Sequence, residues 1–115
     1  MIFAPKKFRG DYIPMLRNKA EEILEYIVLA NNLDLVGEDS SESTRAQRLE
    51  YQRLALANCA VLDVRLRSSC KAGCISPHQF EVATGHTYAL SNSIKNWIAS
   101  DRKRVNDLNK VLESN

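Results

Sequence analysis

The stretch "ISPHQFE", residues 75–81, is typical of a helix start. Ser76 is a favourable N-cap, and Pro77 suits the first helical turn, where its missing N–H is not needed. Gln79 follows Ser76 by three residues, the spacing at which its side chain bonds back to the cap backbone. Just upstream, Gly73 stands where a glycine in the left-handed conformation would end a preceding helix. We therefore expect two antiparallel helices joined by a short turn.

Apolar residues spaced three and four apart extend in both directions from this turn. The helix after it has the stripe Phe80, Ala83, Thr87, Leu90, Ile94, Trp97 and Ile98, continued by Val105, Leu108 and Leu112. The helix before it, over about residues 44–72, has the predicted apolar stripe Leu54, Ala57, Val61 and Val64, which Leu56, Leu62 and Leu66 widen. Two apolar faces on one helix favour burial on more than one side, in a bundle interior or at a subunit interface.

The N-terminal part predicts one more helix, preceded by an arm. Residues 1–14 mix prolines and a glycine with basic residues, which predicts a basic arm leading into a helix near Met15. The apolar stripe of that helix is Leu16, Ala20, Ile23, Leu24, Ile27 and Val28. The following "NNLDLVGEDSSEST", residues 31–44, predicts a loop, and Ser41 or Ser43 is the expected cap of the next helix.

These patterns predict an all-α protein, an antiparallel up-down bundle of three long helices within one small domain of 115 residues. The bundle domain covers residues 15–104, and residues 105–115 form a C-terminal helical extension or tail, which is the candidate for a fourth element. Because three helices make a thin bundle, we expect a partner or further copies of the chain to cover the remaining apolar surface.

Location and charge narrow the function. No segment approaches the ~20 apolar residues of a membrane span, no secretory signal pattern is visible, and three cysteines do not form a secreted disulfide framework. We therefore expect a cytoplasmic protein without a membrane partner.

Residues 21–42 hold seven acidic and no basic residues, so the rest of the chain holds all 16 basic residues against seven acidic ones. This asymmetry indicates either an anionic partner or complementarity between neighbouring helices or subunits.

Catalytic and metal-binding patterns are weak. Cys70, Cys74 and His78 are spaced by four, but a glycine and a proline break the helix between them, and no fourth zinc ligand is evident. His78 and His86 have no clear carboxylate partner, and no nucleophile elbow, glycine-rich phosphate loop or paired-carboxylate motif is present. We therefore expect no enzyme, no metal site and no cofactor.

The basic residues of the second and third helices are the candidate binding site. They are Arg53, Arg65, Arg67, Lys71, Arg102, Lys103 and Arg104. The planar guanidinium suits phosphate contacts, so these residues favour binding of a nucleic-acid backbone, which requires that they converge on one exposed face. The alternative is a solvated face whose cations offset helix dipoles.

Three stretches carry a family resemblance: "LDVRLRSS" (62–69), "ISPHQFEVAT" (75–84) and "IKNWIASDRKR" (94–104). Over about residues 20–104 the chain resembles the accessory variability determinant (Avd) family, which accompanies the reverse transcriptases of diversity-generating retroelements. A wider group of four-helix-bundle proteins, encoded in intervening sequences of ribosomal RNA genes, shares much of the pattern. Family members usually have another helix ahead of the segment matching residues 19–31.

The resemblance implies a non-enzymatic partner protein. Avd proteins form a positively charged, ring-like pentamer that binds the reverse transcriptase and its template RNA, and the complex makes mutagenic complementary DNA. Arg65, Arg67 and Lys71 lie in the matching helix and are the positions carried over as partner-contacting. The alternative is an oligomeric helical module that binds only protein.

Overall fold

The computed structural model describes residues 6–114, with side chains described from Tyr12 onward. This part of the chain forms α1 (Lys6–Asn31), α2 (Glu42–Lys71) and α3 (Pro77–Glu113), and it contains no strand. The predicted all-α class is therefore confirmed.

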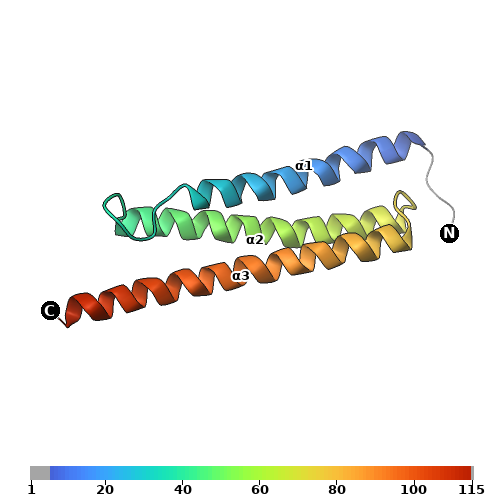
Figure 1. Cartoon of the computed structure of the whole chain (residues 1–115). Coiled ribbons are helices and arrows are strands. Elements are labelled where there is room, and N and C mark those ends of the chain that lie inside the picture. The colour runs from blue at the N-terminus through green and yellow to red at the C-terminus, as the bar shows by residue number, and fades with distance from the viewer. Residues whose placement is uncertain (1–5, 115) are drawn as a thin grey trace.

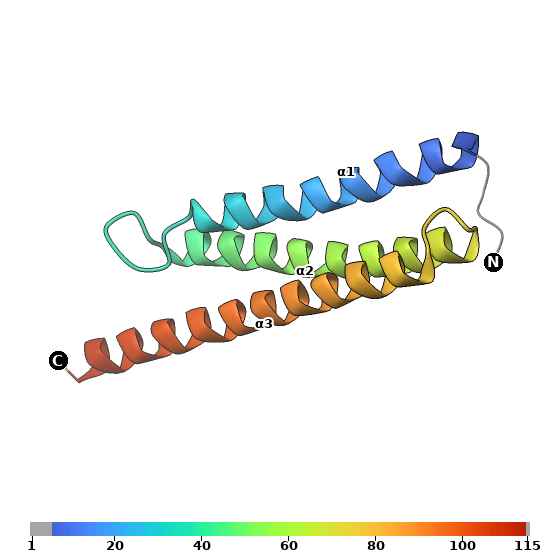
Figure 2. The same cartoon turned by 45° about the vertical axis from the view of Figure 1, so that its right-hand side comes forward.

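The three helices run antiparallel, with α2 in the middle. Figures 1 and 2 show α2 between α1 and α3 in both views, and the backbones of α1 and α3 each approach α2 but not each other. The Cα atoms span 67 × 20 × 13 Å, so the molecule is long and thin. The described helices thus form an open arrangement in which two outer helices flank a central one.

Side chains from all three helices form one small core. Its fully buried members are Ile23 of α1, Ala55 and Cys59 of α2, and Ile94 of α3. Partly buried residues surround them: Tyr26, Ile27, Leu56, Leu62, Leu90 and Ile98. This core lies near mid-length of α2 and α3 and in the second half of α1, so the helix ends depend on other contacts.

The turn between α2 and α3 forms as predicted. The Ser76 hydroxyl oxygen accepts a hydrogen bond from the Gln79 backbone N–H at 3.0 Å, and the Gln79 side-chain oxygen accepts one from the Ser76 N–H at 2.8 Å. Gly73 has a φ of +76°, the left-handed conformation that ends α2. At the other end of α2, Ser41 is the N-cap, and its hydroxyl accepts from the Thr44 N–H at 3.0 Å.

The predicted start of the first helix is wrong. α1 begins at Lys6 rather than near Met15, and Pro14 lies inside it. Proline lacks the N–H that would bond to the carbonyl of residue 10, but its φ of about −65° is itself helical, so the helix continues past it. Residues 1–5 of the predicted basic arm lie outside the described part.

The predicted apolar face of α2 is confirmed only in part: Leu66 is buried and Leu56 and Leu62 pack against the core, but three residues of its predicted centre are exposed. Val61 and Val64 are 38% and 61% exposed, and Ala57 is exposed as well. The buried residues of α2 are instead Arg48, Gln52, Ala55, Cys59, Leu66 and Ser69. Their spacing of three, four and seven is helical, but half of them are polar, so hydrophobicity does not mark this stripe.

The α3 stripe is confirmed in its middle, where Thr87 and Ile94 are buried. Beyond Val105 the helix continues as predicted to Glu113, but Leu108 is 36% and Leu112 63% exposed. Residues 105–113 are therefore a continuation of α3 whose last turns extend past α2 (Figure 1).

Two glycine substitutions should change stability in opposite directions. Gly85 is exposed inside α3, and a Cβ added there meets nothing within 4 Å, so Gly85→Ala should raise the free energy of unfolding by about 1 kcal/mol. Gly73→Ala forces a residue with a Cβ into the left-handed conformation and should lower the free energy of unfolding by about 1–2 kcal/mol. Urea unfolding measures both, and a shift in the same direction would contradict the turn geometry.

Candidate nucleic-acid interface

A buried polar cluster joins α2 to α3. Arg48 and Asp101 are each 7% exposed, and Gln52 is 1% exposed. Arg48 donates from Nε to Asp101 Oδ2 at 2.7 Å and from Nη2 to Oδ1 at 3.2 Å, a bidentate pair. Gln52 Nε2 donates to the same Oδ2 at 2.8 Å. The carboxylate is thus held from two positions one turn apart on α2.

The same arginine holds the end of α1. Arg48 Nη1 donates to the Leu33 carbonyl at 2.9 Å and lies 3.5 Å from the Ala30 carbonyl. The last carbonyls of a helix have no partner within the helix, and a cation there also offsets the helix dipole. The guanidinium lies over the Trp97 ring, 5.2 Å from its centroid. One side chain therefore contacts all three helices.

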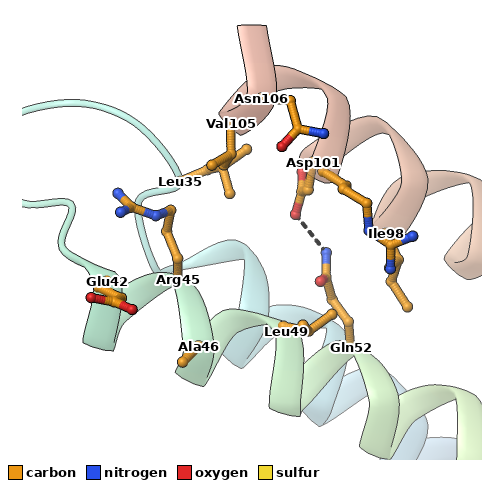
Figure 3. A pocket seen from close by; sticks show the side chains of 11 residues that line it. Leu35, Glu42, Arg45, Ala46, Leu49, Gln52, Ile98, Asp101, Val105 and Asn106 are labelled. Atoms are coloured by element: carbon orange, nitrogen blue, oxygen red, sulfur yellow. Dashed lines mark hydrogen bonds between the residues drawn. The ribbon is translucent and has the colours of Figure 1, made fainter. Parts of the chain in front are cut away.

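A pocket of about 300 Å³ lies beside this cluster (Figure 3). The loop after α1, the first half of α2 and the last third of α3 line it. The lining residues are Leu35, Glu42, Arg45, Ala46, Leu49, Gln52, Ile98, Asp101, Arg102, Val105 and Asn106.

A groove of about 560 Å³ lies farther along the same two helices. Its lining includes small or short side chains, among them Ala57, Ala60, Thr84, Thr87 and Ser91. The cations Arg53, Arg67 and Lys95 line the groove as well, together with Asp63 and Tyr88, which is 71% exposed.

The pocket and the groove lie on one side of the α2–α3 pair. On α2 the lining residues Leu49, Arg53, Leu56 and Ala60 are three and four apart, and residues at this spacing share a helix face. On α3, the lining residues from Thr84 to Arg102 have the same spacing, so they also share one helix face. We call the cations of this face the α2–α3 seam: Arg45, Arg53, Arg67, Lys95 and Arg102.

The structure brings together only part of the predicted site. Arg53, Arg67 and Arg102 lie on the seam, whereas Arg65, Lys71, Lys103 and Arg104 line neither hollow. Arg67 lies over the Phe80 ring, 6.0 Å from its centroid, and the 22 residues from Phe80 to Arg102 rise about 33 Å along α3. The three predicted residues on the seam therefore form a line rather than one patch, and the other four lie outside it. Arg45 and Lys95 were missed, although both are visible as basic residues in the correct helical register.

Most of these cations have no acidic partner. Arg67 Nε pairs with Asp63 Oδ2 at 3.0 Å on the exposed surface. For the other six predicted residues, no carboxylate among the described side chains lies within 4.0 Å. Their charge is available to an external anion.

The cysteines and histidines form no recognisable site in the described part of the chain. No group of three or more His, Cys, Asp or Glu side chains there lies close enough to hold a metal ion. Burial raises the pKa of the Cys59 thiol, and a hydrogen bond with Ser91 lowers it by less. A neutral thiol is a poor nucleophile, so Cys59 is a packing residue.

Comparison with known proteins gives no assignment: no protein-family model, no curated protein and no solved structure matches the chain. No helix in the described residues is both long and apolar enough to cross a bilayer.

Removing the charge of Asp101 should destabilise the protein strongly. Asp101→Asn leaves the Arg48 guanidinium buried without a counter-charge, and breaking a buried pair in this way costs about 3–5 kcal/mol. Asp107→Asn, an exposed change on the same helix, should alter the free energy of unfolding by no more than about 0.5 kcal/mol. Urea unfolding of the two variants compares them directly, and equal effects would mean that the buried pair does not hold the helices.

Proposed function

We propose that this protein is a non-enzymatic accessory protein that binds nucleic acid along the α2–α3 seam. The observation that carries the proposal is the line of cations on one side of two helices. Four of the five (Arg45, Arg53, Lys95 and Arg102) have no carboxylate within 4.0 Å among the described side chains. Such a line suits the phosphates of a strand lying parallel to the helices, because each cation that neutralises a phosphate releases a condensed counterion.

The charge distribution supports the same proposal. Residues 42–114, which include α2 and α3, carry eleven basic and seven acidic residues. The acidic run of residues 21–42 lies mostly on α1 and the following loop. These two segments do not line the groove, and they line the pocket only through Leu35; Glu42, the first residue of α2, also lines the pocket. Phosphates would therefore meet the basic side of the molecule with little opposing charge.

The resemblance to the Avd family adds the partners. We propose that the bound strand is the template RNA of a diversity-generating retroelement and that the protein acts in the cytoplasm with a reverse transcriptase. The transcriptase carries out the mutagenic complementary-DNA synthesis, and this chain supplies a rigid helical surface and phosphate contacts.

Neutralising two seam cations should weaken RNA binding and reduce its salt dependence. For Arg53→Ala/Lys95→Ala we expect weaker binding to a structured RNA with single-stranded loops. The slope of log K against log salt should fall by about 1.4, since each lost contact to a single strand removes about 0.7. Fluorescence anisotropy across a salt series measures both quantities.

The matched control is Arg17→Ala/Lys110→Ala, which removes the same charge from exposed positions outside both hollows. It should keep the wild-type slope. Equal slopes for the two double variants would mean that the seam cations contribute no more to RNA binding than other surface cations do. Absence of RNA binding by the wild-type chain at low salt would refute the nucleic-acid proposal.

A second candidate function, an oligomeric module that binds only protein, is favoured by exposed apolar side chains. Leu24, Val28 and Leu29 form a shallow hollow on α1 beside Glu25. Val61 and Val64 are exposed on α2, the helix that carries Arg53, Arg67 and Lys71. These two faces are apolar and flanked by opposite charges. We propose that α1 of one copy docks on α2 of the next, a head-to-tail contact that closes into a ring, with five copies by family resemblance.

Polar substitution on the α1 face should dissociate such an oligomer. Leu24→Gln/Val28→Gln removes two apolar side chains that are 60% and 49% exposed, so the monomer should fold and the oligomer should be lost. Leu108→Gln/Leu112→Gln is the matched control at the end of α3 and should leave the assembly intact. Sedimentation velocity distinguishes the two variants, and a wild-type chain that is monomeric at every concentration would refute self-association.

A further inference from the structure

Tyr88 of α3 is an aromatic side chain that the fold leaves in solvent. It is 71% exposed, more than any other large apolar side chain among the described residues, and it lines the groove between α2 and α3. The other described aromatic side chains are all partly buried: Tyr12, Tyr26, Tyr51, Phe80 and Trp97. A single exposed ring is common on protein surfaces, so its surroundings decide what it can bind.

The neighbours of Tyr88 on its own helix leave the ring uncovered. The residues three and four positions away are Thr84, Gly85, Ser91 and Asn92, and none of them has a large side chain. A long helical side chain leans over the turn before its own Cα, which here contains Gly85. A Cβ added at Gly85 would meet nothing within 4 Å. The ring therefore has an open face toward solvent.

Two contacts between α2 and α3 show where Tyr88 lies along the groove. The Cys59 thiol forms a hydrogen bond with Ser91, and Arg67 lies over the Phe80 ring. Tyr88 is three residues from Ser91 and eight from Phe80, so it lies between the two contacts. At 1.5 Å per residue, Phe80 and the Arg67 guanidinium above it lie about 12 Å from Tyr88 along the helix axis.

Two further cations lie on the other side of Tyr88. Lys95 follows it by seven residues, or about 10 Å along α3. Because the helices are antiparallel (Figures 1 and 2), Arg53 of α2 lies in the same direction from the Cys59–Ser91 contact as Lys95 does. The distances from that contact are about 9 Å for Arg53 and about 6 Å for Lys95, so the two cations are nearly level. No carboxylate of the described residues lies within 4.0 Å of either.

The groove contains one acidic residue, Asp63, and it is nearly level with Tyr88. Asp63 lies about 6 Å beyond the Cys59–Ser91 contact, and Tyr88 lies about 4.5 Å beyond it in the same direction. One Asp63 carboxylate oxygen accepts a hydrogen bond from Arg67 Nε at 3.0 Å. The carboxylate would repel a phosphate at this level, whereas it can accept hydrogen bonds from the N–H groups of a base. The charges therefore favour phosphate beside Arg53 and Lys95 and an uncharged group beside Tyr88.

We propose that the groove binds an unpaired base of a nucleic-acid strand, stacked on Tyr88, while neighbouring phosphates of that strand bind Arg53 and Lys95. This inference rests on the proposed nucleic-acid function and adds to it that the seam selects single-stranded over double-stranded RNA. A base inside a duplex has both faces covered by its neighbours, so only an unpaired base can stack on a side chain. Every base has a π-face, so we expect little preference among the four bases.

An aromatic or apolar side chain of a protein partner fits the groove less well. Such a side chain could cover the Tyr88 ring, but it would leave the nearby Arg53 and Lys95 without an anion. In a nucleic-acid strand each flat base is followed by a phosphate, so one repeating unit supplies both partners. The groove lining has three cations and one carboxylate, a balance that suits this unit.

Binding of a single-stranded RNA of about 12 nucleotides, and of the same sequence as a duplex, tests the proposal by fluorescence anisotropy across a salt series. Tyr88→Ala should weaken binding of the single strand about tenfold and leave duplex binding unchanged. The slope of log K against log salt should stay at the wild-type value, because no charge is removed. This outcome differs from that expected for Arg53→Ala/Lys95→Ala, which lowers the slope.

Two variants serve as controls. Tyr88→Trp keeps an aromatic face and should keep the affinity for the single strand. Val82→Ala removes an exposed apolar side chain from α3 outside the groove and should also bind as the wild type does. Circular dichroism checks that each variant is folded.

Wild-type affinity of Tyr88→Ala for the single strand, or an equal loss for the duplex, would overturn the stacking proposal and leave the phosphate contacts of the seam standing. A loss in Tyr88→Trp as large as in Tyr88→Ala would also overturn it. Absence of RNA binding by the wild-type chain at low salt would overturn the proposed function and this inference together.

Discussion

The contact between Arg48 and Asp101 is the constraint on which the arrangement of the three helices depends. It lies toward one end of the long molecule, away from the small apolar core around Ile23 and Ile94. Through the Leu33 carbonyl it also determines where α1 ends relative to α2. A bidentate arginine–carboxylate pair has a strict geometry, so it defines the register of α2 against α3 more narrowly than apolar packing does. Burying the pair contributes specificity here more clearly than net stability.

This register places the cations. The α2–α3 seam exists because Arg45 and Arg53 of α2 come to the same side as Lys95 and Arg102 of α3. A shift of α3 by one residue would rotate its lining positions by about 100° and remove them from that side. Asp101 therefore has two roles. It neutralises the buried guanidinium, and it positions the helix that carries the exposed ones.

Most local signals in the sequence were reliable, although Pro14 wrongly suggested a later start for α1, and signals that depend on neighbouring helices were not reliable. The Ser76 cap, the left-handed Gly73 and the α3 stripe follow from residues a few positions apart, and the structure confirms them. The inward face of α2 could not be found from hydrophobicity, because Arg48, Gln52 and Ser69 occupy it. Their polar atoms bond to Asp101 or to backbone carbonyls, and those partners become visible only when the helices are assembled. For the same reason, charge alone selected Arg53, Arg67 and Arg102 but gave no indication that they form a line.

The proposed surfaces for nucleic acid and for further copies of the chain overlap only on α2, where Arg53 and Arg67 belong to both. The shallow apolar hollow on α1 includes Glu25, which would repel a phosphate backbone, whereas the seam on the α2–α3 side would attract one. Docking α1 of one copy on the α2 valines of another would cover acidic charge with basic charge while leaving Lys95 and Arg102 of α3 uncovered. A ring built in this way would repeat the α3 cations in every copy. Its affinity for a long strand would then rise through multivalency, although each copy contributes only a few phosphate contacts.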